Sequence, residues 1–222
     1  MNTMSSMNQA VREFPESNRS AEYQHLTLHQ DAKNAILWCY MHAAPRPCFT
    51  PELLEELNRW ASHLRCQAPE QKLRYHVTAS LTPGVFNLGG DLDVFRKLIF
   101  AGDAERLYAY ARRCIDVLYA NMTGFDSDVT TISLIQGEAL GGGFEAALSS
   151  EVLIAERHSR FGFPEILFNL FPGMGAFSLL SRRIGPSLAQ RLILSGKVYE
   201  AEELHAMGVV DIGCYSEDIT VA

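Results

Sequence analysis

The chain has 222 residues, of which 47% are hydrophobic and 20% are charged, and its formal net charge is -7 at pH 7. This composition is typical of one globular domain that is long enough to bury a sizeable core. The acidic balance gives no sign of the basic face that a nucleic-acid-binding protein needs. Because the apolar runs are far too short to span a bilayer and segment 1–20 is polar, we expect a cytoplasmic protein without membrane insertion.

The cysteine and histidine patterns give no sign of a metal or disulfide site. The five cysteines form no C-x-x-C pair, and none of the seven histidines pairs with a cysteine at metal-ligand spacing. We therefore expect no metal and no cofactor, and a cysteine–histidine nucleophilic pair has no support in the sequence. The residues expected to be reduced structural thiols are Cys39, Cys48, Cys66, Cys114 and Cys214.

Two strands and a helix are predicted at the start of the folded region. Segments 25–30 and 35–41 are predicted to be a strand pair joined by a turn at 31–34. Thr50 can cap a helix whose first position is Pro51. Apolar residues recur along this helix at helical spacing and are predicted to face the core. They are Leu53, Leu57, Trp60 and Leu64.

A third strand and a long helical stretch are predicted next. Segment 75–81 is predicted to be a strand, and its position after a helix favours a parallel sheet with crossover helices. A tight loop at 86–91 follows, in which Asp91 is predicted to cap a helix. The helical stretch 92–121 is interrupted at 101–103. Its predicted buried face consists of Leu107, Ala111, Cys114 and Leu118.

The most informative stretch is a short apolar strand, 131–135, followed by a turn and three consecutive glycines, Gly141 to Gly143. A helix is predicted to begin there and to carry Glu145 in its first turn. Glycines let a ligand approach the backbone closely, and unpaired N–H groups at a helix start favour an anionic oxygen such as a thioester enolate. A carboxylate three residues on can act as a base beside that oxygen. The simpler alternative is a glycine-rich bend where a helix packs tightly on a strand.

A second carboxylate, Glu165, follows a strand predicted at 152–155 and an extended piece at 160–163. Pro164 fixes the backbone before it and so directs the carboxylate. The residues that follow are apolar, namely Ile166, Leu167, Phe168, Leu170 and Phe171. Such surroundings are expected to raise the pKa of the carboxyl group and to favour a role as proton donor. The structural alternative is a charge placed at a helix N-terminus.

The last quarter of the chain is predicted to be mainly helical. A turn at 172–175 precedes a helix through Leu180, and Ser187 is predicted to cap a second helix. The helix predicted at 200–207 is closed by Gly208.

Three glycine-containing segments occur in an order that resembles a known family. They are 85–92 (VFNLGGDL), 134–149 (LIQGEALGGGFEAALS) and 161–175 (FGFPEILFNLFPGMG). Together they resemble the crotonase (enoyl-CoA hydratase/isomerase) superfamily, and the resemblance extends from about residue 35 to residue 211. It implies an α/β fold built as a spiral of ββα units, and an enzyme that acts on acyl thioesters.

The resemblance also implies the site residues. In the family, the first glycine-containing loop and the triple-glycine turn each supply one N–H of an oxyanion hole, and these donors match Gly90 and Gly142. The two catalytic carboxylates of family hydratases match Glu145 and Glu165. The family often has alanine where Gly90 stands, but a backbone donor does not need the side chain. The sequence does not say which glutamate is the base and which is the acid.

The amino-acid sequences of the second and third segments resemble those of one branch of the family, the diffusible-signal-factor synthases (RpfF-like). That resemblance implies a dehydratase (lyase) with thioesterase activity, which converts a 3-hydroxyacyl group on acyl carrier protein into a free cis-2-unsaturated fatty acid for quorum sensing. Many CoA-binding members carry a basic residue just before the first oxyanion loop, and segment 81–86 has none. This absence favours a carrier-protein substrate over a CoA thioester. A regulatory sensor protein is a further partner that the branch implies.

Two alternatives stay open, an ordinary enoyl-CoA hydratase or isomerase of fatty-acid metabolism and a crotonase-like binding protein that has lost turnover. The family continues beyond Asp211 into helices that complete the pocket and the homotrimer. We therefore expect a truncated C-terminal helical region, weak activity and exposed apolar surface. The predicted organisation is a flexible N-terminus at 1–24, a crotonase-like core at 25–211 and a divergent or truncated tail at 212–222.

Overall fold

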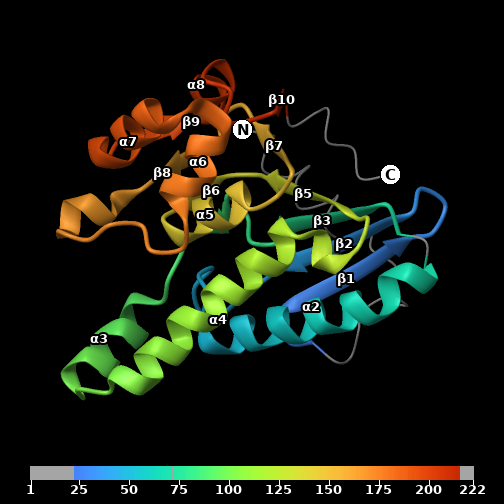
Figure 1. Ribbon diagram of the computed structural model, residues 1–222, viewed down its shortest axis with the longest axis horizontal. Coiled ribbons are helices and arrows are strands. Elements are labelled where there is room, and N and C mark those ends of the chain that lie inside the picture. The colour runs from blue at the N-terminus through green and yellow to red at the C-terminus, as the bar shows by residue number, and fades with distance from the viewer. Residues whose placement is uncertain (1–22, 72, 216–222) are drawn as a thin grey trace, which may run out of the picture.

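The computed structural model describes residues 23–71 and 73–215, which form two β-sheets with helices packed against them (Figure 1). In this part of the chain the larger sheet has the strand order β1-β2-β3-β5-β7-β10, and the smaller sheet has the order β4-β6-β8-β9. The strands of the larger sheet are β1 (Leu26–Asp31), β2 (Ile36–Met41), β3 (Tyr75–Ser80), β5 (Thr130–Ile135), β7 (Val152–Glu156) and β10 (Ile212–Cys214). Those of the smaller sheet are β4 (Val85–Asn87), β6 (Glu138–Leu140), β8 (Arg160–Gly162) and β9 (Val198–Glu200). The helices are α2 (Pro51–Gln71), α3 (Leu92–Phe100), α4 (Ala104–Met122), η2 (Gly124–Asp126), α5 (Gly142–Leu148), η3 (Pro164–Phe168), α6 (Ala176–Ile184), α7 (Pro186–Ser195) and α8 (Ala201–Ala206).

The chain passes between the sheets in a repeated order of strand, strand and helix. Strand β3 of the larger sheet leads to β4 of the smaller sheet and then to α3. The same path is repeated by β5, β6 and α5, and then by β7, β8 and the helical segment η3–α6. The pairs β2-β3, β3-β5, β5-β7, β4-β6 and β6-β8 are all parallel, as crossover connections require. The predicted α/β spiral of ββα units is confirmed.

The predicted first strands and helix are confirmed. Strands β1 and β2 pair antiparallel, and Pro51 is the first residue of α2. The Thr50 hydroxyl oxygen accepts a hydrogen bond from the Leu53 N–H at 3.2 Å, as a helix cap does. The residues predicted to face the core from this helix are all buried, namely Leu53, Leu57, Trp60 and Leu64. Capping and helical spacing are therefore sufficient to place α2.

The buried face of α4 differs from the prediction at two residues. Ala111 is exposed and Leu107 is only half-buried, so their predicted places in the core are wrong. The buried stripe includes Tyr110, Cys114, Leu118 and Asn121. Tyr110 can be buried because its hydroxyl group is paired, donating to the Phe49 carbonyl oxygen at 2.5 Å and accepting from the Asp91 N–H at 2.9 Å. Both partners are distant in sequence, and a helical pattern cannot reveal them.

The predicted cap of α7 is also wrong. Ser187 lies inside the helix, which begins at Pro186 with Gly185 before it. Proline suits the first helical turn because it has no N–H to leave unpaired and because its φ is already helical. The start signal is therefore the proline and not the serine.

The smaller sheet is largely missed by sequence reasoning. Each of its strands has three residues, which is too short for the alternation of apolar and polar residues to show. Only the segment 160–163 is predicted to be extended, and it contains β8. The three loops that form the candidate site follow strands of this small sheet, so the sequence alone does not show how these loops come together.

The ordered core reaches further at both ends than the predicted core. Strand β10 pairs parallel with β7, so the larger sheet continues to Cys214, beyond the predicted boundary at Asp211. The predicted flexible segment 1–24 lies mostly outside the described residues. Within the described part, Tyr23 is buried and packs edge-on against Trp60, with ring centroids 6.3 Å apart.

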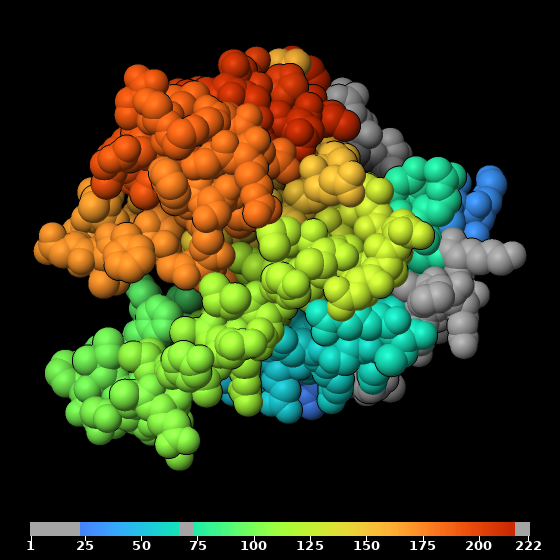
Figure 2. All heavy atoms as spheres, in the orientation of Figure 1, coloured from blue at the N-terminus to red at the C-terminus, as the bar shows by residue number. Residues whose placement is uncertain are grey.

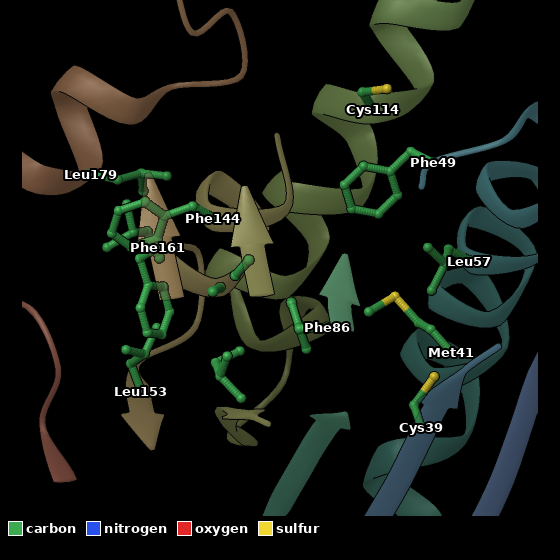
Figure 3. Close-up of a cluster of buried hydrophobic side chains, with 14 of the residues drawn as sticks. Cys39, Met41, Phe49, Leu57, Phe86, Cys114, Phe144, Leu153, Phe161 and Leu179 are labelled. Carbon is green, nitrogen blue, oxygen red and sulfur yellow. The ribbon is translucent and has the colours of Figure 1, made fainter. Parts of the chain in front are cut away.

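Aromatic rings hold α5 in place within the core (Figure 3). The ring centroid of Phe144 on α5 lies 5.0 Å from that of Phe161 on β8 and 4.8 Å from that of Phe163. All three rings are fully or almost fully buried. Burial of a phenylalanine ring contributes about 1.5–3 kcal/mol, so this cluster strongly ties α5 to β8.

Large apolar side chains are exposed on two segments that lie on the same side of the molecule, with a hollow between them (Figure 2). Around η3 they are Leu167, Phe168, Leu170 and Phe171, and on α3 they are Leu92, Ile99 and Phe100. The expected exposure of apolar surface is therefore present in the folded chain. Within the described ranges, no helix is both long enough and apolar enough to cross a membrane.

We expect Gly143→Ala to lower the free energy of unfolding by about 1–3 kcal/mol, which is the usual cost of overpacking. A methyl group at this position would overlap the Asn87 carbonyl group at the end of β4, so α5 would have to move away from the strand. Urea unfolding measures the change.

Gly213→Ala in β10 is the matched control for this prediction. No described atom lies within 4 Å of the methyl group that it would add, so stability should change by less than about 0.5 kcal/mol. Equal stability of the two variants would contradict the close packing of α5 on β4.

Candidate active site

Three loops meet at one edge of the smaller sheet. Strands β4, β6 and β8 are adjacent and parallel, so the segments that follow them leave from the same edge. These segments carry Gly90, Gly142 and Glu165. A methyl group on Gly142 would lie 3.6 Å from the Gly90 nitrogen, and one on Gly141 would lie 2.5 Å from Glu165 Oε1. The structure therefore brings together residues that are up to 75 positions apart in the sequence.

Two backbone N–H groups are available at this edge. Within residues 23–71 and 73–215, neither the Gly90 N–H nor the Gly142 N–H donates a hydrogen bond. The Asn87 side chain shapes the first loop by accepting a hydrogen bond from the Gly89 N–H at 2.7 Å. Gly89 has a φ of +87°, which favours glycine, and a methyl group there would lie 2.8 Å from the Gly142 nitrogen. The two loops thus touch, and their free N–H groups lie close together.

Glu145 is buried one turn into α5 and is held by the backbone. Its Oε1 accepts hydrogen bonds from the Met174 N–H at 2.8 Å and from the Ala176 N–H at 2.9 Å. The pKa of Glu145 is raised to about 7, mainly by burial and to a lesser extent by the negative charge of Glu165, while the N–H groups of Ala176, Met174 and Gly175 oppose the shift.

Glu165 presents an oxygen without a protein partner. Its Oε2 is buried and makes no hydrogen bond to any described residue, and burial raises the pKa of its carboxyl group. The predicted direction of the pKa shift is confirmed, but the predicted cause is wrong. The apolar side chains that follow Glu165 point outward, as Phe168 and Phe171 show with exposed fractions of 66% and 79%. The carboxylate itself lies against the glycine turn, with Oε1 2.5 Å from where a methyl group on Gly141 would stand.

The two carboxyl groups titrate as a coupled pair. Burial raises the pKa of both, that of Glu145 to about 7, and the charge of Glu165 contributes to the shift of Glu145. Glu145 therefore still holds a proton part of the time near neutral pH. Carboxyl groups with raised pKa values are suited to general acid–base catalysis.

A network around Asp91 supports the first loop. The Asp91 carboxylate caps α3 by accepting hydrogen bonds from the Asp93 and Val94 N–H groups, which confirms the predicted cap. It also forms an ion pair with Arg46 at 2.9 Å. Sequence reasoning identified the cap but missed Arg46, and it missed the N–H clamp on Glu145. The only sequence signal for the clamp is the glycine-rich turn at 172–175, whose role the pattern does not reveal.

An apolar groove of about 170 Å³ lies between α4 and α6. Leu118 and Met122 line it from α4, and Leu179 lines it from α6. Met174 and Gly175 also line it, next to the N–H groups that hold Glu145. The groove therefore passes beside the segment that holds Glu145, and its largely apolar wall suits a hydrocarbon chain.

The cysteines take no part in this arrangement. Burial raises the pKa of Cys39 and Cys114 to about 12 and that of Cys48 to about 11, so all three are poorly nucleophilic. All five cysteines are free thiols in the structure, as predicted. In the described part of the chain, no group of three or more His, Cys, Asp or Glu side chains is placed to hold a metal ion.

The fold is a spiral of ββα units, and at one edge of its smaller sheet two free backbone N–H groups lie beside two carboxyl groups. Residues 31–220 match the enoyl-CoA hydratase/isomerase family, and the chain belongs to this family.

Two curated relatives illustrate this membership. The mitochondrial methylglutaconyl-CoA hydratase of Mus musculus is 29% identical over 183 residues, which cover 82% of this chain and 55% of that protein. The probable enoyl-CoA hydratase echA8 of Mycobacterium tuberculosis is 33% identical over 159 residues, which cover 66% of this chain and 62% of that protein. The chain thus spans little more than half the length of these relatives.

Solved structures show the same fold. DspI of Pseudomonas aeruginosa is 27% identical, with a TM-score of 0.77 over 90% of this chain and 77% of that chain. An enoyl-CoA hydratase from Bacillus anthracis has a TM-score of 0.78 over 87% of this chain and 71% of that chain. Its sequence identity is 22%, so this second likeness concerns the fold alone.

The raised pKa of Glu145 predicts how stability depends on pH. The ordinary value is 4.5 and the folded value is about 7, so between them the folded protein holds a proton that the unfolded chain has lost. The free energy of unfolding should therefore fall as pH rises from 4.5 to about 7, by up to about 1.4 kcal/mol per pH unit, and then level off. Urea unfolding across this pH range measures the slope.

Glu145→Gln should remove this contribution, because glutamine does not titrate and can still accept the two backbone hydrogen bonds. Glu105→Gln, at an exposed position in α4, is the control and should keep the wild-type slope. A wild-type slope in Glu145→Gln would show that Glu145 does not have a raised pKa.

Proposed function

We propose that this chain carries the active site of an enzyme that dehydrates 3-hydroxyacyl thioesters and, in reverse, hydrates 2-enoyl thioesters. The observation that supports this most directly is the buried, unpartnered Oε2 of Glu165, which lies beside Glu145 and two free N–H donors. A buried carboxylate oxygen without a partner is costly, and a substrate or water proton at this position would satisfy it.

The two N–H donors supply the electrostatic part of the reaction. An α-proton of a thioester is too weakly acidic for a free carboxylate to remove unless the enolate oxygen is stabilised as it forms. Gly90 and Gly142 would donate to that oxygen, and loss of one such donor typically costs about 100-fold to 1,000-fold in kcat. Because these donors belong to the backbone and are fixed by touching loops, they need no rearrangement during the reaction.

Within this proposal the two glutamates have different roles. Glu165, whose buried Oε2 has no partner among the described residues, removes the α-proton from C2 of the substrate. Glu145, which retains its proton near neutral pH, gives that proton to the leaving 3-hydroxyl group, which departs as water. Water addition to the 2-enoyl thioester follows the same steps in reverse.

A finer proposal is that the complete enzyme is a diffusible-signal-factor synthase that also hydrolyses the thioester. After dehydration Glu145 is ionised and can take a proton from a water molecule that attacks the thioester carbonyl carbon. The two donors then stabilise the tetrahedral oxyanion, and the C–S bond breaks to release the acid and the thiol. The similarity of segments 134–149 and 161–175 to signal-synthase sequences supports this proposal, and the apolar α4–α6 groove suits the acyl chain. The absence of a basic residue in 81–86 favours a carrier-protein substrate.

The competing candidate is an ordinary enoyl-CoA hydratase. The names of the curated relatives, methylglutaconyl-CoA hydratase and probable enoyl-CoA hydratase, favour it. It uses the same residues but ends at the thioester, so the product distinguishes the two candidates.

We expect Glu145→Gln and Glu165→Gln each to reduce the dehydration rate by about 100-fold to 10,000-fold, as loss of a general acid or base does. Glutamine keeps the shape but cannot transfer the proton, so circular dichroism should remain that of the wild type. Glu105→Gln is the control and should retain full turnover. A near-normal rate in either site variant removes that residue from the mechanism.

The product of a 3-hydroxydodecanoyl group on acyl carrier protein should be a free cis-2-unsaturated acid. Mass spectrometry detects the free acid, and proton NMR couplings across the double bond assign its geometry. The same reaction with the CoA thioester tests the choice of carrier. Accumulation of a trans-2-enoyl thioester without free acid would reject the signal synthase in favour of the ordinary hydratase, and no product from either substrate would favour a binding protein.

A further inference from the structure

We propose that two aromatic side chains, Tyr110 on α4 and Phe95 on α3, act as positioning residues for the Gly90 N–H. Neither residue lies in a sequence motif of the site. The contacts themselves are independent of the reaction, whereas their effect on thioester chemistry rests on the function proposed above.

Tyr110 joins the two backbone segments that flank the donor. Its hydroxyl group donates to the Phe49 carbonyl oxygen at 2.5 Å and accepts from the Asp91 N–H at 2.9 Å. On the other side of Gly90, the Phe49 N–H donates to the Gly89 carbonyl oxygen at 2.8 Å. Hydrogen bonds therefore fix Gly89 and Asp91, the two residues next to Gly90. Gly90 forms an isolated parallel β-bridge with Phe49, and its own N–H stays free. Burial raises the pKa of Tyr110, so the hydroxyl group remains neutral and can both donate and accept.

Phe95 fills the space beside Gly90 that a side chain would occupy. A methyl group on Gly90 would lie 2.9 Å from the edge of the Phe95 ring. That ring cannot easily retreat, because it packs edge-on against Tyr110 with centroids 5.2 Å apart and an interplanar angle of 82°. The backbone of Gly90 is outside the left-handed region, so an alanine would fit its conformation. The packing of Phe95, and not the backbone, accounts for glycine where the family often has alanine.

Together these contacts set the direction of one donor. An oxyanion donor acts only when it lies within about 2.7–3.1 Å of the developing charge, so a displacement of a few tenths of an ångström matters. The pair also links the donor to α3 and α4, the helices that form one side of the hollow seen in Figure 2.

Tyr110→Phe tests the hydrogen-bonded half of the pair, because it keeps the ring and removes only the hydroxyl group. The probe is a 3-oxoacyl-CoA, whose enolate has its own near-ultraviolet absorption and carries the oxyanion that the donors should stabilise. We expect about ten-fold less bound enolate at equal total binding, and a fall in kcat of about ten-fold with KM changed less than about two-fold, as partial loss of a donor predicts. Tyr108→Phe is the control on the same helix, where the side chain is 69% exposed, and should match the wild type.

A double-mutant cycle tests the packed half. Gly90→Ala should reduce the enolate signal and the melting temperature, because the new methyl group meets the Phe95 ring. Phe95→Leu in the Gly90→Ala background should recover most of both losses by removing the ring edge, although Phe95→Leu alone leaves a gap. Failure of this rescue would overturn the role of Phe95.

Backbone NMR separates this proposal from the proposed function, since it needs no substrate. In Tyr110→Phe the Asp91 amide should exchange at least ten-fold faster and the Gly90 amide resonance should move, while that of Gly142 stays in place. Those changes in a protein without enolate or turnover would reject the thioester function and retain the positioning of Gly90. Unchanged Gly90 and Asp91 amides in Tyr110→Phe would overturn the positioning role of Tyr110.

Discussion

The parallel pairing of β4, β6 and β8 is the constraint on which the site depends. Three strands of three residues each bring the segments after them to one edge, and those segments carry both candidate donors and one candidate carboxylate. Close packing leaves no room for side chains there, which is why Gly141 and Gly143 abut Glu165 and Asn87. The glycines are therefore as much a requirement of assembling the small sheet and α5 as of binding an anion.

The burial of two carboxyl groups at one place is unfavourable for folding and useful for chemistry. Glu145 is compensated through Oε1 by two backbone N–H groups, whereas Glu165 keeps a buried oxygen without a protein partner. The helix that carries Glu145 is tied to the core by aromatic packing, in which Phe144 contacts the rings of Phe161 and Phe163. Burial raises the pKa of both carboxyl groups, and the backbone N–H groups that hold Glu145 only partly offset its shift.

Sequence reasoning recovers the framework of this protein and only part of its site. Capping at Thr50 and helical spacing are local signals, so α2 is predicted well, as are the strands of the larger sheet except β10. The resemblance of three sequence segments to the family singles out Glu145, Glu165, Gly90 and Gly142. Their environment depends on contacts between distant segments, which leave no local pattern. The partners of Glu145 and the burial of Tyr110 are therefore missed, and the pKa shift of Glu165 is predicted in the right direction for the wrong reason.

Met174 serves the site through two separate parts of the same residue. Its N–H holds the Glu145 carboxylate, while its sulfur lies over Gly142, 2.8 Å from where a methyl group on that glycine would stand. Every residue except proline keeps the N–H, so the side chain at this position can vary without releasing the carboxylate. Position 174 is therefore a place where evolution can reshape the wall above one candidate donor while the backbone hold on Glu145 stays intact.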